Sequence, residues 1–166
     1  TTIVREIARL LSEEDAHSPG RNVLIVDTSN EIGGDGDAPH HCVGMARRMM
    51  VPSLDQQSNV MVECVQNHTP HVMVIDEIGR PKEVFAAGTV KKRGVRLIAS
   101  AHGDLRGLVD NSELNGLVGG VKVVTWGDET ASRRSASRNV ALSKVTTQRI
   151  GPPTFDLIVE IQRGAR

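Results

Sequence analysis

The pair Asp76–Glu77 is the strongest candidate for chemistry in this chain. Four apolar residues, Val72–Ile75, come directly before the two acids and predict a buried strand that ends where the acids begin. Ligands of open parallel sheets bind at the carboxyl ends of the strands, so such a strand brings both carboxylates to a binding edge. Asp76 could hold Mg²⁺ through a water molecule, and Glu77 could polarise an attacking water. The alternative is a strand that merely ends in acids at a solvated loop.

The first two residues, Thr1 and Thr2, open a segment, 1–11, whose apolar residues have helical spacing. Segment 71–79, HVMVIDEIG, has the Walker B pattern of P-loop nucleotide hydrolases. In those proteins the last residues of G-x-x-x-x-G-K-[ST] open a helix whose amides cradle phosphates. A chain that begins directly after the Gly-Lys of this motif would begin with Thr or Ser and continue straight into a helix, as this chain does. We therefore expect Thr1 to be a Mg²⁺-binding hydroxyl, together with Asp76, and Thr2 to lie beside the α-phosphate. The alternative is that Thr1 only caps the helix.

Apolar runs alternate with helical patterns along the chain and predict an α/β fold. Strands are expected at 23–26, 72–75, 95–100, 121–125 and 154–162, and helices at 1–11, 42–50, 54–68 and 81–93. Short helical turns are expected over 104–118 and a loop over 28–41. This order is typical of a mostly parallel sheet with helices on both faces. We interpret 1–166 as a single RecA/AAA-like P-loop NTPase domain whose P-loop strand and loop would precede Thr1.

Length, composition and charge exclude several classes of protein. The 166 residues hold 20 Lys and Arg against 20 Asp and Glu, and the aromatic residues are two Phe and one Trp. No apolar run approaches the ~20 residues that cross a bilayer, so a membrane-spanning segment is excluded. Zero net charge argues against a uniformly basic DNA-coating protein, and the few rings argue against a platform of stacked aromatics. The two cysteines do not make a disulfide framework, which favours a reducing compartment.

Several blocks of sequence resemble one known family. They are Thr1-Thr2-Ile3, VDTSNEIGGDGD (26–37), ARRMMVP (46–52), VIDEIGRPKEV (74–84), LIASAHG (97–103) and GPPTFD (151–156). These blocks are similar to the plastid and cyanobacterial AAA-type ATPases, whose bacterial relatives are the stage III sporulation AA proteins. The resemblance implies ATP and Mg²⁺ as cofactors, a hexameric ring of identical subunits, and a chloroplast or cyanobacterial cytoplasmic location. Many members of the family also carry a C-terminal domain that binds single-stranded nucleic acid.

A more distant resemblance, to the hexameric secretion ATPases, implies roles for two further residues. Asp27 and Glu31 match the spacing of the acids in the acidic box of those enzymes, and Ser100-Ala101-His102 is similar to their His box. On this basis Glu31 would orient water and His102 would sense the γ-phosphate. The alternatives are that Asp27 and Glu31 cap a turn and that His102 caps a strand end.

Arginine fingers, which a neighbouring subunit supplies to the nucleotide, are further candidates. The candidates are Arg47, Arg48, Arg80, Arg133 and Arg134, and Arg80 is the one predicted to contact the nucleotide. The alternative is that each arginine is an ordinary solvated surface residue. The acid-free segment 130–149 is a candidate patch for nucleic-acid phosphates or for the acidic face of a partner. Its candidate residues are Arg133, Arg134 and Arg138. The alternative is a solvated hairpin.

A zinc set and a calcium loop are weaker hypotheses. The zinc ligands would be His40, His41, Cys42, Cys64 and His68. Their spacing fits no standard knuckle, and surface histidines with a packed thiol are the preferred interpretation. The acids at 35 and 37 suggest calcium, but the twelve-residue loop pattern is absent and a flexible loop is preferred.

Three hypotheses for function follow from these patterns. We expect Mg²⁺-dependent ATP binding and hydrolysis, with Asp76 as the acid that holds the metal and Glu77 as the base. The target on which the ATPase acts could be nucleic acid. The first alternative is a module that senses nucleotide, or binds single-stranded nucleic acid, without turnover. The second is a structural subunit of an assembly.

Overall fold

The computed structural model describes residues 1–16, 19–125 and 145–162. The chain divides into two compact units, Thr1–Asp104 and Leu105–Arg166, which are described separately below.

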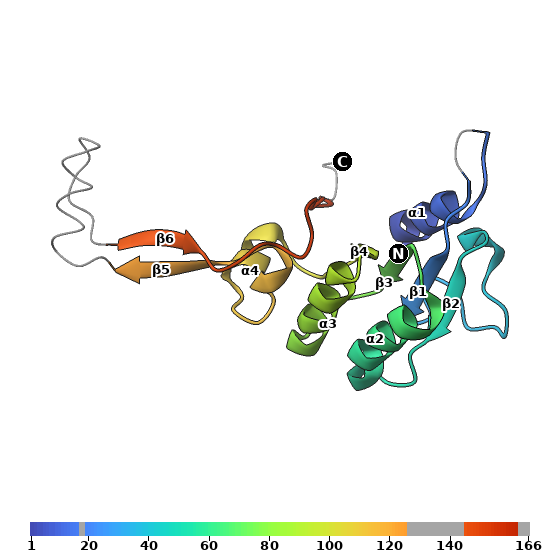
Figure 1. The fold of residues 1–166 in the computed structure, drawn as a ribbon, viewed down its shortest axis with the longest axis horizontal. Helices are drawn as coiled ribbons and strands as arrows, with labels where there is room; N and C mark the ends of the chain where they lie inside the picture. Colours follow the sequence, from blue (N-terminus) through green and yellow to red (C-terminus); the bar gives the residue numbers. More distant parts are fainter. Residues whose placement is uncertain (17–18, 126–144, 163–166) are drawn as a thin grey trace. The chain divides into compact units, whose positions relative to one another are not determined.

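A parallel sheet forms the centre of the first unit. Its strands are β1 (Val23–Asp27), β2 (Arg47–Met50), β3 (Val72–Ile75) and β4 (Arg96–Ala99), in the order β2-β1-β3-β4 (Figure 1). All three neighbouring pairs are parallel. β1 and β3 are buried along their whole lengths because they lie at the centre of the sheet, which explains their unbroken apolar runs. The predicted α/β class with a parallel sheet is confirmed.

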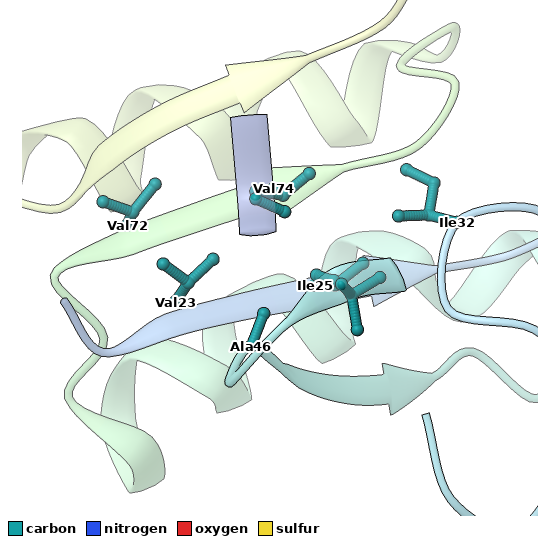
Figure 2. Packing of buried hydrophobic residues seen from close by; sticks show 8 residues of the cluster. Val23, Ile25, Ile32, Ala46, Val72 and Val74 are labelled. Atoms are coloured by element: carbon teal, nitrogen blue, oxygen red, sulfur yellow. The ribbon is translucent and has the colours of Figure 1, made fainter. Parts of the chain in front are cut away.

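Helices cover both faces of this sheet. On one face, Ala8 of α1 (Thr2–Ser12) packs in a cluster with alternate strand residues, including Val23, Ile25 and Val74 (Figure 2). The intervening strand residues point to the other face, since successive side chains of a strand alternate. On that face α2 (Gln57–His68) and α3 (Pro81–Lys92) pack against each other (Figure 1). The two-sided arrangement is the one the sequence predicted.

The helix predicted at 42–50 is wrong. A short 3-10 turn, η1 (His41–Val43), is followed by strand β2. Met, Arg and Ala favour a helix in isolation, but tertiary pairing overrides that propensity. β2 extends the sheet along β1. The guanidinium of Arg48 in β2 donates hydrogen bonds to the carbonyl oxygens of Gly33 and Gly36 in the preceding loop.

The second unit contains α4 (Leu105–Asp110), the turn η3 (Asn115–Leu117) and an antiparallel pair, β5 (Val121–Thr125) and β6 (Val145–Arg149). The strand predicted at 154–162 is wrong, because those residues make no strand ladder within the described chain. The start of this segment is instead held by backbone bonds from Thr154 to Gly116 and from Phe155 to Leu117. The predicted patch residues Arg133, Arg134 and Arg138 lie outside the described residues.

No helix within the described residues is both long and apolar enough to cross a membrane.

Candidate functional site

The carboxyl ends of three parallel strands bring the predicted acids together. Asp27 is the last residue of β1, Asp76 directly follows β3, and Ser100 directly follows β4. Backbone bonds continue the strand ladders to this point: the amide of Asp76 donates to Val26, and that of Ser100 donates to Ile75, both at 3.2 Å. The edge predicted from the order of strands therefore exists, and it is lined by oxygen atoms.

Asp76 is fixed by hydroxyl groups from two different loops. Its side chain is buried, and its Oδ2 accepts a hydrogen bond from Ser29 at 2.8 Å while its Oδ1 accepts one from Ser100 at 3.1 Å. The buried amide of Gln57 donates to the backbone oxygen of Asp76 at 2.7 Å. Each carboxylate oxygen has two lone pairs, so each can still accept a further hydrogen bond or contact a cation.

Glu77 has a backbone conformation that is unusual for its residue type. Its φ is +52°, in the left-handed region where a side chain costs energy, and such residues cluster at functional sites. The backbone amide of Glu77 donates to the hydroxyl of Ser100 at 3.0 Å. Its carboxylate is 44% exposed and lies 3.0 Å from Nε2 of His102. Two residues predicted to be catalytic thus contact each other and face solvent.

Thr1 and Glu31 form a second pair of predicted residues. The hydroxyl of Thr1 donates to Oε2 of Glu31 at 2.8 Å, although the two are far apart in sequence. Thr1 occupies the N-cap position of α1 but makes no side-chain cap bond, so its hydroxyl serves the loop rather than the helix. Arg5 helps to hold the same loop by donating from Nε to the carbonyl of Ile32 at 3.0 Å. Thr2 is exposed in the first turn of α1.

Asp27 anchors the loop that carries Ser29 and Glu31. It is fully buried, and its Oδ2 accepts hydrogen bonds from the amides of Ile32 at 3.2 Å and Gly33 at 2.7 Å. Its Oδ1 is buried without a hydrogen-bond partner among the described residues. Burial raises the pKa of Asp27, and the negative charge of Asp76 raises it further.

The donor set at this edge suits Mg²⁺ better than zinc. Asp76, the hydroxyl of Ser29 and the orphan oxygen of Asp27 are all hard oxygen donors, which Mg²⁺ prefers. Within the described residues, no group of three or more His, Cys, Asp or Glu side chains is arranged to hold a metal ion. Of the zinc candidates, Cys64 is fully buried, and burial raises the pKa of its thiol to about 11, which disfavours the thiolate that zinc requires.

Arg80 makes its contacts at the start of α3. Its guanidinium donates to the carbonyl of Leu54 and lies 3.5 Å from the carboxylate of Glu83. These contacts hold it against the turn η2 (Leu54–Gln56). Its predicted role toward a nucleotide stays a prediction.

The sequence interpretation did not predict which three residues hold Asp76, although Ser100 was named as part of the His box. They are Ser29, Gln57 and Ser100. Ser29 and Ser100 follow strands that the sequence predicted, so a polar residue just after each strand was the available signal. Gln57 gave no such signal, because it is a buried polar residue at the start of a helix.

Comparison with known proteins identifies the family. The family described as "Sporulation stage III, protein AA" matches residues 1–123. The chain belongs to this family. Seedling Plastid Development 1 of Arabidopsis thaliana is 48% identical over 97% of the chain, and the ycf45 protein of Porphyra purpurea is 47% identical over 97%. Stage III sporulation protein AA of Bacillus subtilis is 33% identical over 62% of the chain and 33% of its own length.

The chain spans only part of its plastid relatives. It covers 22% of the length of the Arabidopsis protein and 27% of that of the Porphyra protein. These relatives confirm the predicted chloroplast or cyanobacterial origin of the chain. No solved structure shows significant similarity to it.

Proposed function

We propose that this chain is the core of a Mg²⁺-dependent ATPase of the P-loop class. The observation that carries the proposal is the arrangement at the carboxyl edge of the parallel sheet. There a buried, doubly hydrogen-bonded Asp76 adjoins a solvent-facing Glu77 that contacts His102. A metal-side acid followed by a water-activating acid is the pair that hydrolysis of a phosphoanhydride needs.

Asp76, Glu77 and His102 would each have a separate role in hydrolysis. Ser29 and Ser100 fix the carboxylate of Asp76, which would help to hold a hydrated Mg²⁺. Glu77 would accept a proton from the water that attacks the γ-phosphorus, while the bond to the β-phosphate oxygen breaks and ADP leaves. His102 would orient the Glu77 carboxylate through Nε2, 3.0 Å away, and would donate to a phosphate oxygen from Nδ1. Mg²⁺, when bound, neutralises charge that develops on the phosphates.

The contact between Thr1 and Glu31 supports the same proposal. Glu31 accepts the hydroxyl hydrogen of Thr1, and this leaves the lone pairs of the threonine oxygen available to a cation. A phosphate-binding loop ahead of Thr1 would end where α1 begins. β4 lies at the edge of the described sheet with Leu97 and Ile98 only partly buried, so a further strand can pair there.

A longer chain, extended upstream through the predicted P-loop, tests the proposal. Wild type should hydrolyse ATP in the presence of Mg²⁺, and Glu77→Gln should lower turnover at least 100-fold while it leaves ATP binding intact, since the amide cannot take the proton. Glu63→Gln, at an exposed position of α2, is the matched control and should keep full turnover.

The outcomes separate the alternatives. Full turnover in Glu77→Gln would remove Glu77 from the mechanism. Tight ATP binding by wild type without turnover would favour the nucleotide-sensing alternative. The hexameric ring and the single-stranded nucleic-acid target that the sequence resemblance implies stay predictions.

A further inference from the structure

The turn that leads into β2 holds a thiol and an imidazole in direct contact. Sγ of Cys42 lies 2.9 Å from Nδ1 of His40, and Cys42 is partly exposed. His40 is exposed as well, and its ring packs on that of His41, with 4.2 Å between the ring centres. A nucleophile beside a base that a further group holds in place is the arrangement of an activated side chain. We call Cys42 and His40 the thiol–imidazole pair.

Hydrogen bonding determines which atom of the pair carries the proton. The backbone amide of Cys42 donates to Nδ1 of His40 at 3.3 Å, so this nitrogen is an acceptor, and the proton of the neutral ring lies on Nε2. The thiol of Cys42 faces the same lone pair and therefore donates its hydrogen to it. Nδ1 is thus placed to take the proton when the thiol ionises, and the thiolate is the form that reacts.

The other cysteine has the opposite surroundings. Cys64 is fully buried in α2, and burial raises the pKa of its thiol to about 11, so this thiol stays protonated and shielded. Cys42 packs with the cluster that includes Ala8 of α1, whereas α2 covers the other face of the sheet (Figure 1). A disulfide between the two cysteines would have to cross the sheet, which leaves Cys42 to react with an outside molecule.

We propose that Cys42 is a modification site that forms a mixed disulfide with a small-molecule disulfide of the glutathione type. Nδ1 of His40 takes the thiol proton, and the thiolate of Cys42 attacks one sulfur atom of the small molecule. The new bond forms as the S–S bond of that molecule breaks, and its second half leaves as a thiolate that takes up the proton from His40. Cys42 is thereby oxidised and the leaving half is reduced, so no other oxidant is needed. Excess thiol runs the same exchange backwards.

The thiol–imidazole pair closes the loop that Asp27 anchors. The backbone amide of His40 donates to the carbonyl of Gly33 at 2.8 Å, and the amide of Gly33 donates to the buried carboxylate of Asp27 at 2.7 Å. A group bonded to Sγ of Cys42 replaces the hydrogen that His40 accepts, and it needs room where Cys42 packs against the buried core. Modification should therefore lower the free energy of unfolding, and the reaction needs neither nucleotide nor Mg²⁺.

Intact mass measurement of the whole chain, incubated with glutathione disulfide at pH 7, tests the site. The folded chain should gain one glutathione, located at Cys42 by peptide mapping, and a reductant should remove it. Cys64 should react only after urea has unfolded the chain, because it is fully buried. Folded Cys42→Ser should gain no glutathione, whereas Cys64→Ala should gain one. The modified chain should unfold at a lower urea concentration than the reduced chain.

The role of His40 is measured with dithiodipyridine, an aromatic disulfide that releases a coloured thiol. His40→Asn keeps an acceptor for the amide of Cys42 but has no base, so it should react more slowly by about 10-fold or more at pH 7. His68→Asn changes a histidine at the end of α2, near the buried Cys64, and should react like wild type. The rate should depend on pH through two titrating groups in wild type and through one in His40→Asn, a difference that a looser fold alone would not produce.

Three results would overturn the proposal. They are a folded wild-type chain in which Cys42 does not react, a His40→Asn chain with the rate and pH profile of wild type, and equal reaction of both cysteines before urea is added. A His40→Asn chain whose Cys64 reacts without urea has lost its fold. In that case the pH profile of wild type decides, and a single titrating group in that profile would also overturn the proposal.

Discussion

Asp27 has a buried oxygen that no hydrogen bond among the described residues satisfies, and burial raises its pKa above the ordinary value of 3.8. The carboxyl group of Asp27 therefore holds its proton more tightly in the folded chain than in the unfolded chain. Between 3.8 and the raised pKa, the unfolded chain has released the proton and the folded chain has not, so the free energy of unfolding falls as pH rises through this window.

Asp27→Asn should remove this dependence, because the amide does not ionise and its oxygen can still accept the amides of Ile32 and Gly33. Urea unfolding of both chains from pH 4 to pH 8 checks this. The stability of the variant relative to wild type should increase with pH and then level off. A difference that stays constant across the range would contradict the assignment.

Glu77 offers a test of backbone strain. At a φ of +52°, glycine is free of the side-chain penalty that alanine keeps, so Glu77→Gly should be more stable than Glu77→Ala by about 1 kcal/mol. The same pair of changes at Glu63, within α2, should give the opposite order, since alanine favours a helix by about 1 kcal/mol over glycine. Urea unfolding measures both differences, and alanine as the more stable residue at position 77 would disprove the strain.

At the level of single residues, the sequence predicted the acids of the candidate site but not the side chains that hold them in place. Asp76 and Glu77 were found because an apolar strand must end before them, and strand ends of a parallel sheet share one edge. The contact of Thr1 with Glu31 brings together two residues that were predicted separately. The bonds from Ser29 and Ser100 to Asp76 depend on loop conformations, which periodicity does not encode.

The start of α3 depends on one buried carboxylate. Glu83 is 2% exposed and accepts hydrogen bonds from the amides of Gly79 at 2.8 Å and Arg80 at 2.9 Å, which closes a capping box. Glu83→Ala should lower the free energy of unfolding by about 1–3 kcal/mol, because two amides lose their acceptor. Glu83→Gln should lose less, since the amide oxygen can accept both bonds. Chemical unfolding measures these changes, and an alanine variant as stable as wild type would rule out the cap.

Elements were predicted well where the local pattern and the tertiary contacts agree. The strands β1 and β3 and the helices α2 and α3 were each predicted from apolar runs or helical spacing. The segment 42–50 was not, because pairing with β1 turns a helix-favouring run of Arg and Met into β2. Segment 154–162 has the alternation of a strand, but a strand also needs a neighbour, and the described chain supplies none there.

The whole molecule distributes its core unevenly between the two units. Among the described residues, Leu117 is the one buried apolar residue that belongs to the second unit, and the others belong to Thr1–Asp104. A chain of residues 1–104 should therefore fold alone and unfold cooperatively in urea, whereas residues 105–166 alone should not. Circular dichroism of the two pieces checks this. A non-cooperative transition for 1–104 would show that its sheet needs the rest of the chain.

The wholly parallel sheet bears on how fast the first unit folds. Two parallel strands cannot be joined by a tight turn, and Val23 pairs with Val72, a partner 49 positions away. Each ladder forms only after a long loop has closed, and loop closure costs entropy before any pairing can offset it. Refolding should accordingly be slow for a unit of this size, with α1, α2 and α3 able to form before the strands meet.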